Sequence, residues 1–120
     1  MERIIETKLD ELLSALKESE LMREYSAAKE SVDSNETNKT LVREYESMQM
    51  NIQRAALSGT SPSSEDMEKF QRLAGLLMMS GDTQKYIING MRVQQLVAEI
   101  TGKIASAANF DLSALMNNLG

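Results

Sequence analysis

The side chains that could do chemistry in this sequence are hydroxyls and carboxylates, because the chain contains no histidine and no cysteine. Histidine is the commonest general base and transition-metal ligand, and cysteine supplies thiolates, disulfides and iron–sulfur ligands. Glu2, Glu6 and Asp10 follow one another at i, i+4 spacing, a row that is compatible with a cation site. With no histidine and no loop to fix the geometry of these carboxylates, a solvated helix face explains them better. We therefore expect no catalytic residue, no metal site and no cofactor.

Tyrosines and methionines are the remaining candidates for a binding site. Tyr25, Tyr45 and Tyr86 fall at inward positions of predicted helices, and we interpret them as amphipathic core residues. The methionines could offer an adaptable surface to a partner helix, or they could fill a core that has few aromatic side chains. The second interpretation is favoured for Met48, Met50, Met67, Met78, Met79 and Met91.

The stretch from residue 82 to residue 107 carries the clearest pattern in the chain. Seven of its positions are separated by alternating steps of four and three residues, which places them on one stripe of an α-helix. A second apolar set widens this surface and consists of Ile87, Ile88, Met91 and Leu96. A helix with so wide an apolar surface needs more than one neighbour, either from its own chain or from a second one. We predict that an oligomer or partner interface is formed by Tyr86, Gly90, Val93, Val97, Ile100 and Ile104.

Four further helices are predicted from the same periodicity and from the residues that begin and end helices. Ser19 is placed to cap one helix, Ser58-Gly59 to end another, and Ser61 with Pro62 to begin a third. The first helix has a predicted inner face made of Ile5, Leu9, Leu12, Leu13 and Leu16. The predicted helices cover residues 3–17, 20–32, 36–57, 62–79 and 82–107.

The length and charge of the chain limit its organisation and its partners. One domain is expected for 120 residues, with a helical body at 1–108 and a short C-terminal tail at 109–120 in which Leu112, Leu115, Met116 and Leu119 could form a docking turn. A net charge of −5 argues against direct binding to nucleic acid or to an anionic membrane, because both need clustered lysine and arginine. No segment has the pattern of a signal peptide or a membrane span, so we expect a cytoplasmic protein.

Charge distribution and helix length both favour a dimer. Only Glu99, Lys103 and Asp111 are charged beyond Val93, fewer than an exposed surface normally carries. A helix of about 25 residues is about 37 Å long, close to the whole diameter, about 35 Å, of a compact domain of this size. We therefore predict an all-α fold, an elongated bundle of about five helices with two long antiparallel helices and a second subunit over the exposed stripe.

A set of short motifs extends along most of the chain. They are Ala15-Leu16-x-x-Ser19-Glu20, Tyr25-x-x-Ala28, Tyr45-x-x-Met48-Gln49-x-x-Ile52-Gln53, Gly59 before Pro62, and Leu96-Val97-Ala98-Glu99-Ile100-x-x-Lys103-Ile104. In this layout the chain resembles the YlbF/YmcA family of small bacterial helical proteins, and most closely its YheA-like members. None of the motifs is a catalytic signature, so the resemblance depends on their spacing over the whole chain.

The resemblance implies an all-α protein that pairs as a dimer. Better-known members of the family act as partners in a complex that steers an mRNA-processing endoribonuclease, which influences competence, sporulation and biofilm formation. This chain has no cysteine, so the iron–sulfur cluster associated with those regulators is not expected, and it has Asn89-Gly90 where the family pattern has a small residue followed by an acid. Our hypothesis is a non-enzymatic, homodimeric interaction protein that serves as a regulator or adaptor. The alternative is a helical bundle that binds a small molecule or a peptide.

Overall fold

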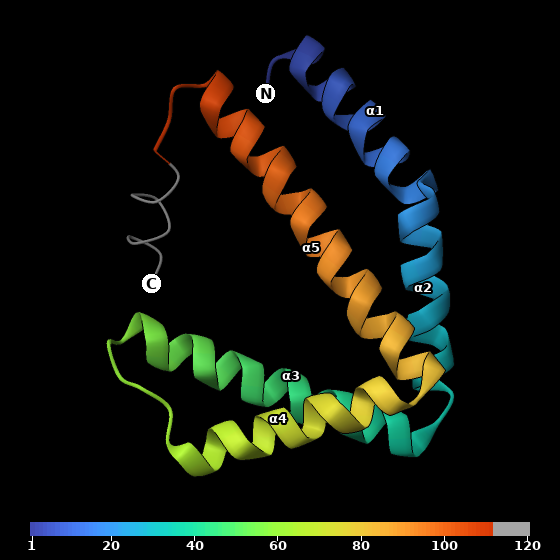
Figure 1. The fold of residues 1–120 in the computed structure, drawn as a ribbon. Coiled ribbons are helices and arrows are strands. Elements are labelled where there is room, and N and C mark those ends of the chain that lie inside the picture. Colours follow the sequence, from blue (N-terminus) through green and yellow to red (C-terminus); the bar gives the residue numbers. More distant parts are fainter. Residues whose placement is uncertain (112–120) are drawn as a thin grey trace.

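The computed structural model describes residues 1–111, and this part of the chain is built from helices joined by short connections (Figure 1). The helices are α1 (Arg3–Glu18), α2 (Glu20–Asp33), α3 (Glu36–Leu57), α4 (Ser64–Met79) and α5 (Gly81–Ala107). No β-strand occurs within residues 1–111. The predicted all-α class, with about five helices, is confirmed. The docking turn predicted for the C-terminal tail falls on residues 112–120, outside the described residues.

The helix termini follow the capping residues of the sequence, with one correction. The hydroxyl of Ser19 accepts a hydrogen bond from the Met22 N–H, and Gly59, with a φ of 76°, ends α3. The prediction that Ser61 caps α4 and that Pro62 is its first residue is wrong. Ser63 is the cap, since its Oγ accepts a hydrogen bond from the Asp66 N–H at 3.1 Å. This register places two acidic side chains, those of Glu65 and Asp66, in the first turn, where the helix dipole favours them.

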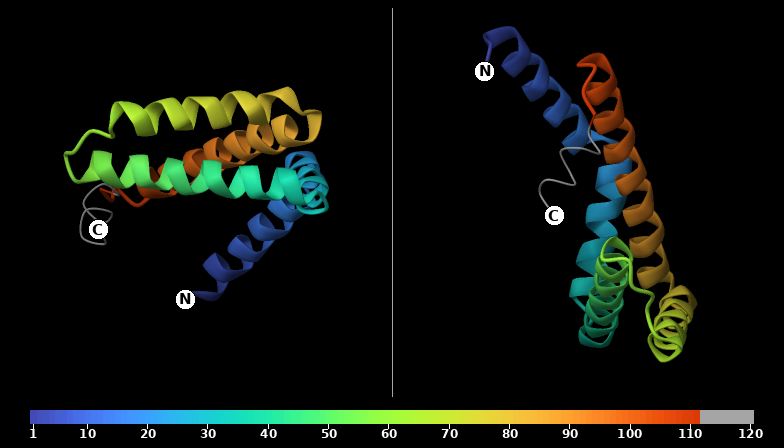
Figure 2. Two further views of the ribbon diagram at one scale, coloured as in Figure 1. Left: turned by 90° about the horizontal axis from the view of Figure 1, so that it is seen from below. Right: turned by 90° about the vertical axis from the view of Figure 1, so that its left-hand side faces the viewer.

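The helices form two arms that meet at one corner (Figure 1). One arm is the antiparallel hairpin of α3 and α4, and the other is the antiparallel pair of α2 and α5, extended beyond α2 by α1. The two long helices, α3 with 22 residues and α5 with 27, start near this corner and diverge from it. Each long helix therefore has a shorter antiparallel neighbour, and the right-hand view of Figure 2 shows the hairpin at one end with α2 and α5 extending away from it.

The hydrophobic core lies at the corner where four helices come together. Val32 of α2, Val42 of α3 and Leu77 of α4 are buried in one cluster, against which Tyr86 and Ile87 of α5 pack. Thr83 strengthens the same corner, because its buried hydroxyl donates to the Leu77 carbonyl at the end of α4. The arms extend far beyond this core, and the radius of gyration is 17.6 Å, whereas a compact domain of this length has about 14 Å. The molecule is thus elongated, as predicted.

The first helix is the least covered part of the fold. No residue of α1 is buried, and its main contact is with the beginning of α2. The break at Ser19 is short, so α1 continues away from the body and does not fold back onto it (Figures 1 and 2). The predicted inner face of this helix is therefore not an inner face in the single chain: Ile5, Leu9 and Leu13 are exposed, and Leu12 and Leu16 are only half-buried.

Candidate interaction surface

The predicted stripe of α5 divides into a covered half and an open half. Tyr86, Gly90 and Val93 are half-buried near the start of the helix, where α2 lies beside it. Further along, Val97 is 51% exposed and Ile104 is 58% exposed, with Ile100 half-buried between them. The first half of the stripe thus contributes to packing within the chain, and the second half presents apolar side chains to solvent.

An aromatic contact holds the covered half of α5 against α2. The rings of Tyr25 and Tyr86 stack with their centroids 5.6 Å apart and their planes at 19°. Gly90 lies one turn after Tyr86, and a Cβ atom placed on it would sit 3.5 Å from Cε1 of Tyr25. The glycine therefore brings the α5 backbone close to the ring. A distance of 3.5 Å is nevertheless an ordinary van der Waals contact, so alanine would also fit there.

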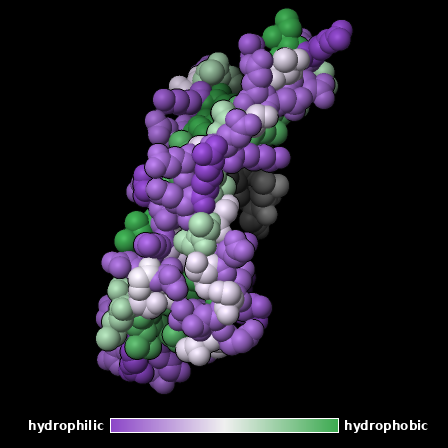
Figure 3. Space-filling view, turned by 90° about the vertical axis from the view of Figure 1, so that its right-hand side faces the viewer, coloured by the Kyte–Doolittle hydropathy of each residue, from purple (hydrophilic) through white to green (hydrophobic). Residues whose placement is uncertain are grey.

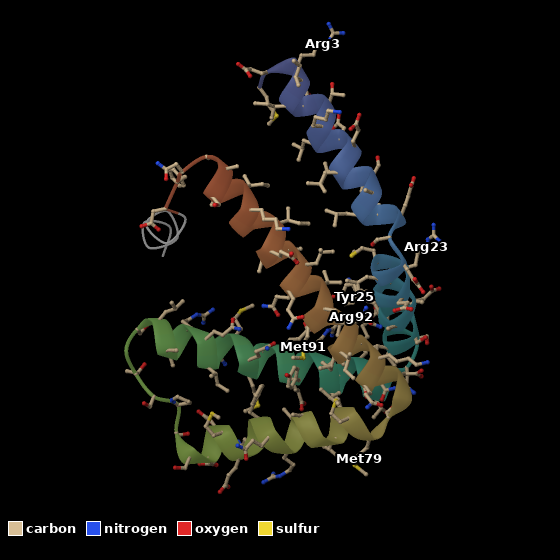
Figure 4. All side chains as sticks on the ribbon, turned by 45° about the horizontal axis from the view of Figure 1, so that its top comes forward. Arg3, Arg23, Tyr25, Met79, Met91 and Arg92 are labelled. Atoms are coloured by element: carbon tan, nitrogen blue, oxygen red, sulfur yellow. The ribbon has the colours of Figure 1, made fainter. Side chains whose placement is uncertain are left out.

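A polar group next to this contact also joins α2 to α5. The side chain of Asn89 is buried, and its Oδ1 accepts a hydrogen bond from Arg92 Nη1 at 3.4 Å. The same guanidinium lies 3.7 Å from the carboxylate of Glu24 on α2. Figure 4 shows Arg92 and Tyr25 close together where the two helices meet, with Arg23 directed away from them. Asn89 departs from the family pattern, and here it anchors the arginine that bridges the helices.

A cleft of about 350 Å³ opens between α3 and the covered half of α5. The hydroxyl of Tyr86 donates a hydrogen bond to Glu46 Oε1 at 2.7 Å across this cleft. Burial of the phenol, together with its hydrogen bond to the carboxylate, raises the pKa of Tyr86 well above its usual value. The phenol therefore remains protonated, and it serves as a donor that links the two arms. Met50 of α3 and Met91 of α5 line the same cleft and are exposed. Met91 is labelled in Figure 4.

The methionines are distributed over several surfaces. Met48 and Met67 are half-buried between α3 and α4, whereas Met78 and Met79 are exposed at the end of α4. The acidic row on α1 is dispersed as well, since no three acidic side chains within residues 1–111 form a group that could hold a metal ion.

Six of the exposed large apolar side chains lie toward one end of the molecule. On α1 they are those of Ile4, Ile5, Leu9 and Leu13, and on α5 those of Val97 and Ile104. The N-terminus of α1 and the C-terminus of α5 lie at the same end, away from the core (Figure 1). In the space-filling view, apolar surface appears among hydrophilic residues along this end and again at the lower end, where the hairpin lies (Figure 3). We call the six side chains on α1 and α5 the apolar end.

Helical periodicity identified the residues of this surface, but not their exposure. The stripe of α5 and the apolar face of α1 were both predicted, and only packing decided that both are open toward their outer ends. Thr83 and Asn89, the buried polar side chains of α5, were not singled out as structural residues. A polar side chain within an otherwise apolar helical stretch was the available signal for Asn89.

None of the helices between residues 1 and 111 has the length and apolar content needed to cross a membrane.

Proteins of similar sequence and structure share the layout of this chain. It is 29% identical over 99 residues to a UPF0342 protein of Caldicellulosiruptor saccharolyticus, a match that covers 82% of each chain. It is 27% identical over 101 residues to a UPF0342 protein of Symbiobacterium thermophilum, which covers 84% of this chain and 90% of the relative.

The same arrangement of helices is found in a solved structure. A protein of unknown function (DUF964) from Bacillus stearothermophilus superposes with a TM-score of 0.75 over 89% of this chain and 94% of its own, at 15% identity. A family model described as control of competence regulator ComK, YlbF/YmcA, matches residues 5–109. The chain therefore belongs to the YlbF/YmcA family.

Proposed function

We propose that this protein is a homodimeric, non-enzymatic interaction protein that acts as a regulator or adaptor in the cytoplasm. The observation that carries the proposal is the apolar end, where large side chains of α1 and α5 are left exposed by the described part of the chain, residues 1–111. The family description refers to control of the regulator ComK, which is a role exerted on another protein. A chain that acts on a regulator needs to bind other proteins. Its net charge of −5 favours this activity over direct contact with nucleic acid.

The physical argument for a second copy begins with α1. This helix has 16 residues and no buried side chain, and an isolated helix of that length is only marginally stable in water. Exposed apolar surface of this kind is characteristic of an interaction site. A two-fold symmetric dimer buries the same patch of both subunits, so one apolar end can cover another.

The low charge on the α5 side of the apolar end favours the same arrangement. On the part of α5 beyond Val93, the charged side chains Glu99 and Lys103 form an ion pair with each other at 3.4 Å. The apolar side chains of this segment therefore have little charge beside them that would have to be desolvated when a second subunit binds.

The chemistry available in the clefts supports a binding role over an enzymatic one. The hydroxyl of Tyr86 is held by Glu46, and burial raises its pKa, so it is a poor nucleophile at neutral pH. An adaptor needs no reacting group. It needs surfaces that other proteins recognise, and the family to which this chain belongs is described by what it controls.

The substitution Val97→Asp tests the proposed dimer. Because Val97 is 51% exposed in the single chain, a carboxylate at this position should leave the monomer folded. In the dimer interface it would be buried without a partner, at a cost of several kcal/mol. We expect the wild type to be a dimer at tens of micromolar by light scattering after size exclusion, and the variant to be a monomer with its helical circular dichroism retained.

The matched control is Gln95→Asp, which introduces a carboxylate at an exposed position on another face of α5. This variant should remain dimeric. A monomeric wild type, or a Val97→Asp variant that remains a folded dimer, would contradict the proposal.

A further inference from the structure

A second surface lies on the hairpin of α3 and α4, and no residue of α5 lines it. It is a groove of about 590 Å³ between the two helices. Its apolar floor consists of Met48 from α3 and of Leu73 and Leu76 from α4. Met48 and Leu73 are half-buried, whereas Leu76 is 46% exposed. Leu73, Leu76 and Met79 follow one another at three-residue spacing, and Met79, 83% exposed, prolongs the apolar row to the end of α4 (Figure 4).

Three cationic side chains surround this floor in a protein whose net charge is −5. Arg43 lies on the α3 side of the groove, and Lys69 and Arg72 lie on the α4 side. Lys69 faces Glu65 at 4.0 Å, with both side chains exposed. Neither Arg43 nor Arg72 has an ion pair within the described part of the chain. Glu44 is the acidic side chain in the lining, so the rim has an excess of positive charge.

We propose that this groove binds an amphipathic helix of a protein partner, with apolar side chains along one face and carboxylates beside them. Helix-in-groove recognition uses apolar anchors about one turn apart, which matches the row from Leu73 to Met79. Arginine pairs with carboxylates through two parallel hydrogen bonds, so the unpaired guanidiniums of the rim select acidic flanks. The flexible side chain of Met48 can adapt to the shape of an inserted residue.

The apolar floor favours a peptide over a nucleic acid. A single-stranded nucleic acid would need aromatic side chains on which bases stack, and the lining of this groove contains none. The inference rests on the proposed function, because it assumes that the protein acts by binding other proteins. It adds a partner site at the opposite end from the apolar end, so that one subunit could bind a second copy and a partner helix at the same time.

The test uses the full chain and a synthetic helical peptide labelled with a fluorophore. The peptide carries leucine at positions i, i+3, i+4 and i+7 and glutamate on both flanks, and a counterpart carries lysine in place of glutamate. Fluorescence anisotropy should show saturable binding of the glutamate peptide, weakened by added salt because the rim contacts are charged. The lysine peptide should bind at least about tenfold more weakly. Absence of saturable binding of the glutamate peptide would overturn the proposal.

A charge-reversal variant tests whether the peptide binds in the groove between α3 and α4. Arg43→Glu combined with Arg72→Glu should weaken the glutamate peptide about tenfold or more and should make the lysine peptide the better ligand. The control, Arg23→Glu combined with Lys29→Glu, changes the net charge equally on exposed positions of α2 and should bind as the wild type does. Equal losses of affinity for the glutamate peptide in both variants would show a non-specific effect of net charge, and would overturn the assignment of the groove as the binding site.

Two further measurements test whether RNA or a second copy of the chain occupies the groove instead. A third separates peptide binding in the groove from formation of the proposed dimer. An RNA oligonucleotide that binds the wild type and fails to bind the Arg43→Glu/Arg72→Glu variant would identify a nucleic-acid site instead. A changed mass of that variant in light scattering would show that the groove is covered by a second copy. The monomer produced by Val97→Asp should still bind the glutamate peptide, so failure of the groove and failure of the dimer give different results.

Discussion

Tyr86 shows how one residue of the α5 stripe connects three helices. Its ring stacks on Tyr25 of α2, and its hydroxyl donates to Glu46 of α3 at 2.7 Å. The periodicity of the sequence predicted a contact at this position, without saying which helix would provide it. Tyr86 acts within the chain by linking α5 to α2 and to α3. Gly90, one turn later, lies close to the ring of Tyr25, although alanine would also fit at this position.

The elevated pKa of Tyr86 should appear in the alkaline stability of the protein. Burial and the hydrogen bond to Glu46 hold the phenol proton of Tyr86 more tightly in the folded state. The protonated phenol therefore contributes its full stabilisation of the fold below the usual tyrosine pKa of about 10. Above that pH the unfolded chain releases the proton first, so the free energy of unfolding should fall as pH rises further. Urea unfolding of the wild type and Tyr86→Phe between pH 9 and 11 should show a steeper decline for the wild type.

The phenolate absorbance of the folded protein gives a second measurement of the same effect. One of the three tyrosines should titrate late, and that late component should disappear in Tyr86→Phe while it persists in Tyr45→Phe. A late component that survives the loss of Tyr86 would refute the assignment.

Gly90 should lower the stability of α5 relative to alanine, although the space around this position would accommodate a Cβ atom. Replacing glycine by alanine inside a helix stabilises it by roughly 1 kcal/mol, and the added Cβ would meet Tyr25 at an ordinary contact distance of 3.5 Å. Gly90→Ala should therefore raise the midpoint of thermal unfolding, as should the control Gly75→Ala, which has no neighbour within 4 Å. Gly59→Ala should lower it, because the φ of Gly59 is 76°. Destabilisation by Gly90→Ala would indicate a close neighbour from outside the chain.

At the scale of elements, α1 differs from the other four helices. It carries a continuous apolar face and yet has no buried residue, whereas α2, α3, α4 and α5 each contribute a buried side chain to the fold. The amphipathic pattern that predicted an inner face is real. Within residues 1–111 no surface covers this face, because α1 extends away from the corner where the core lies.

The substitution Leu9→Asp tests the role assigned to α1. Leu9 is exposed in the single chain, so the change should leave the thermal stability of the α2–α5 body nearly unaltered and should shift the dimer toward monomer. The control Ser14→Asp makes the same change of charge on an exposed position of α1, beside Asp10 and Glu11. Light scattering and circular dichroism measure both effects. If Leu9→Asp lowered stability sharply while the mass stayed unchanged, α1 would belong to the intramolecular core.

At the scale of the whole molecule, stability depends on one small core. The cluster of Val32, Val42 and Leu77 lies where α2, α3, α4 and α5 meet, and the arms extend from it in two directions. With principal extents of 49, 36 and 16 Å, the molecule has a large surface for its volume. Damage to the corner should therefore affect all four helices together.

The pair Leu77→Ala and Leu76→Ala tests this dependence with neighbouring leucines of α4. Leu77 is 1% exposed and Leu76 is 46% exposed. Removing the buried side chain should cost about 2–5 kcal/mol, through lost burial and the cavity that remains. Removing the exposed side chain, in Leu76→Ala, should lower the free energy of unfolding far less. Guanidinium unfolding monitored by circular dichroism should give one cooperative transition in each case, and equal destabilisation by the two variants would contradict the assignment of the core.

The sequence by itself determined the secondary structure of the described residues and the residues of each apolar face. Both signals are local: helix caps act within four residues, and the periodicity of apolar side chains repeats within one or two turns. The range 36–57 was therefore predicted to the residue. The predicted start of α4 is wrong because three serines, Ser61, Ser63 and Ser64, lie close together after Gly59, and only the fold decides that Ser63 is the cap.

Tertiary structure alone decided which apolar faces are covered. The connection at Ser19 directs α1 away from the core, and the corner held by Thr83 separates α5 from α3 along most of their length. Neither direction is encoded in the periodicity of a helix, because the pattern specifies a face and not the neighbour that packs on it. The long helices consequently pair with α4 and α2, and the outer half of the α5 stripe is left open to solvent.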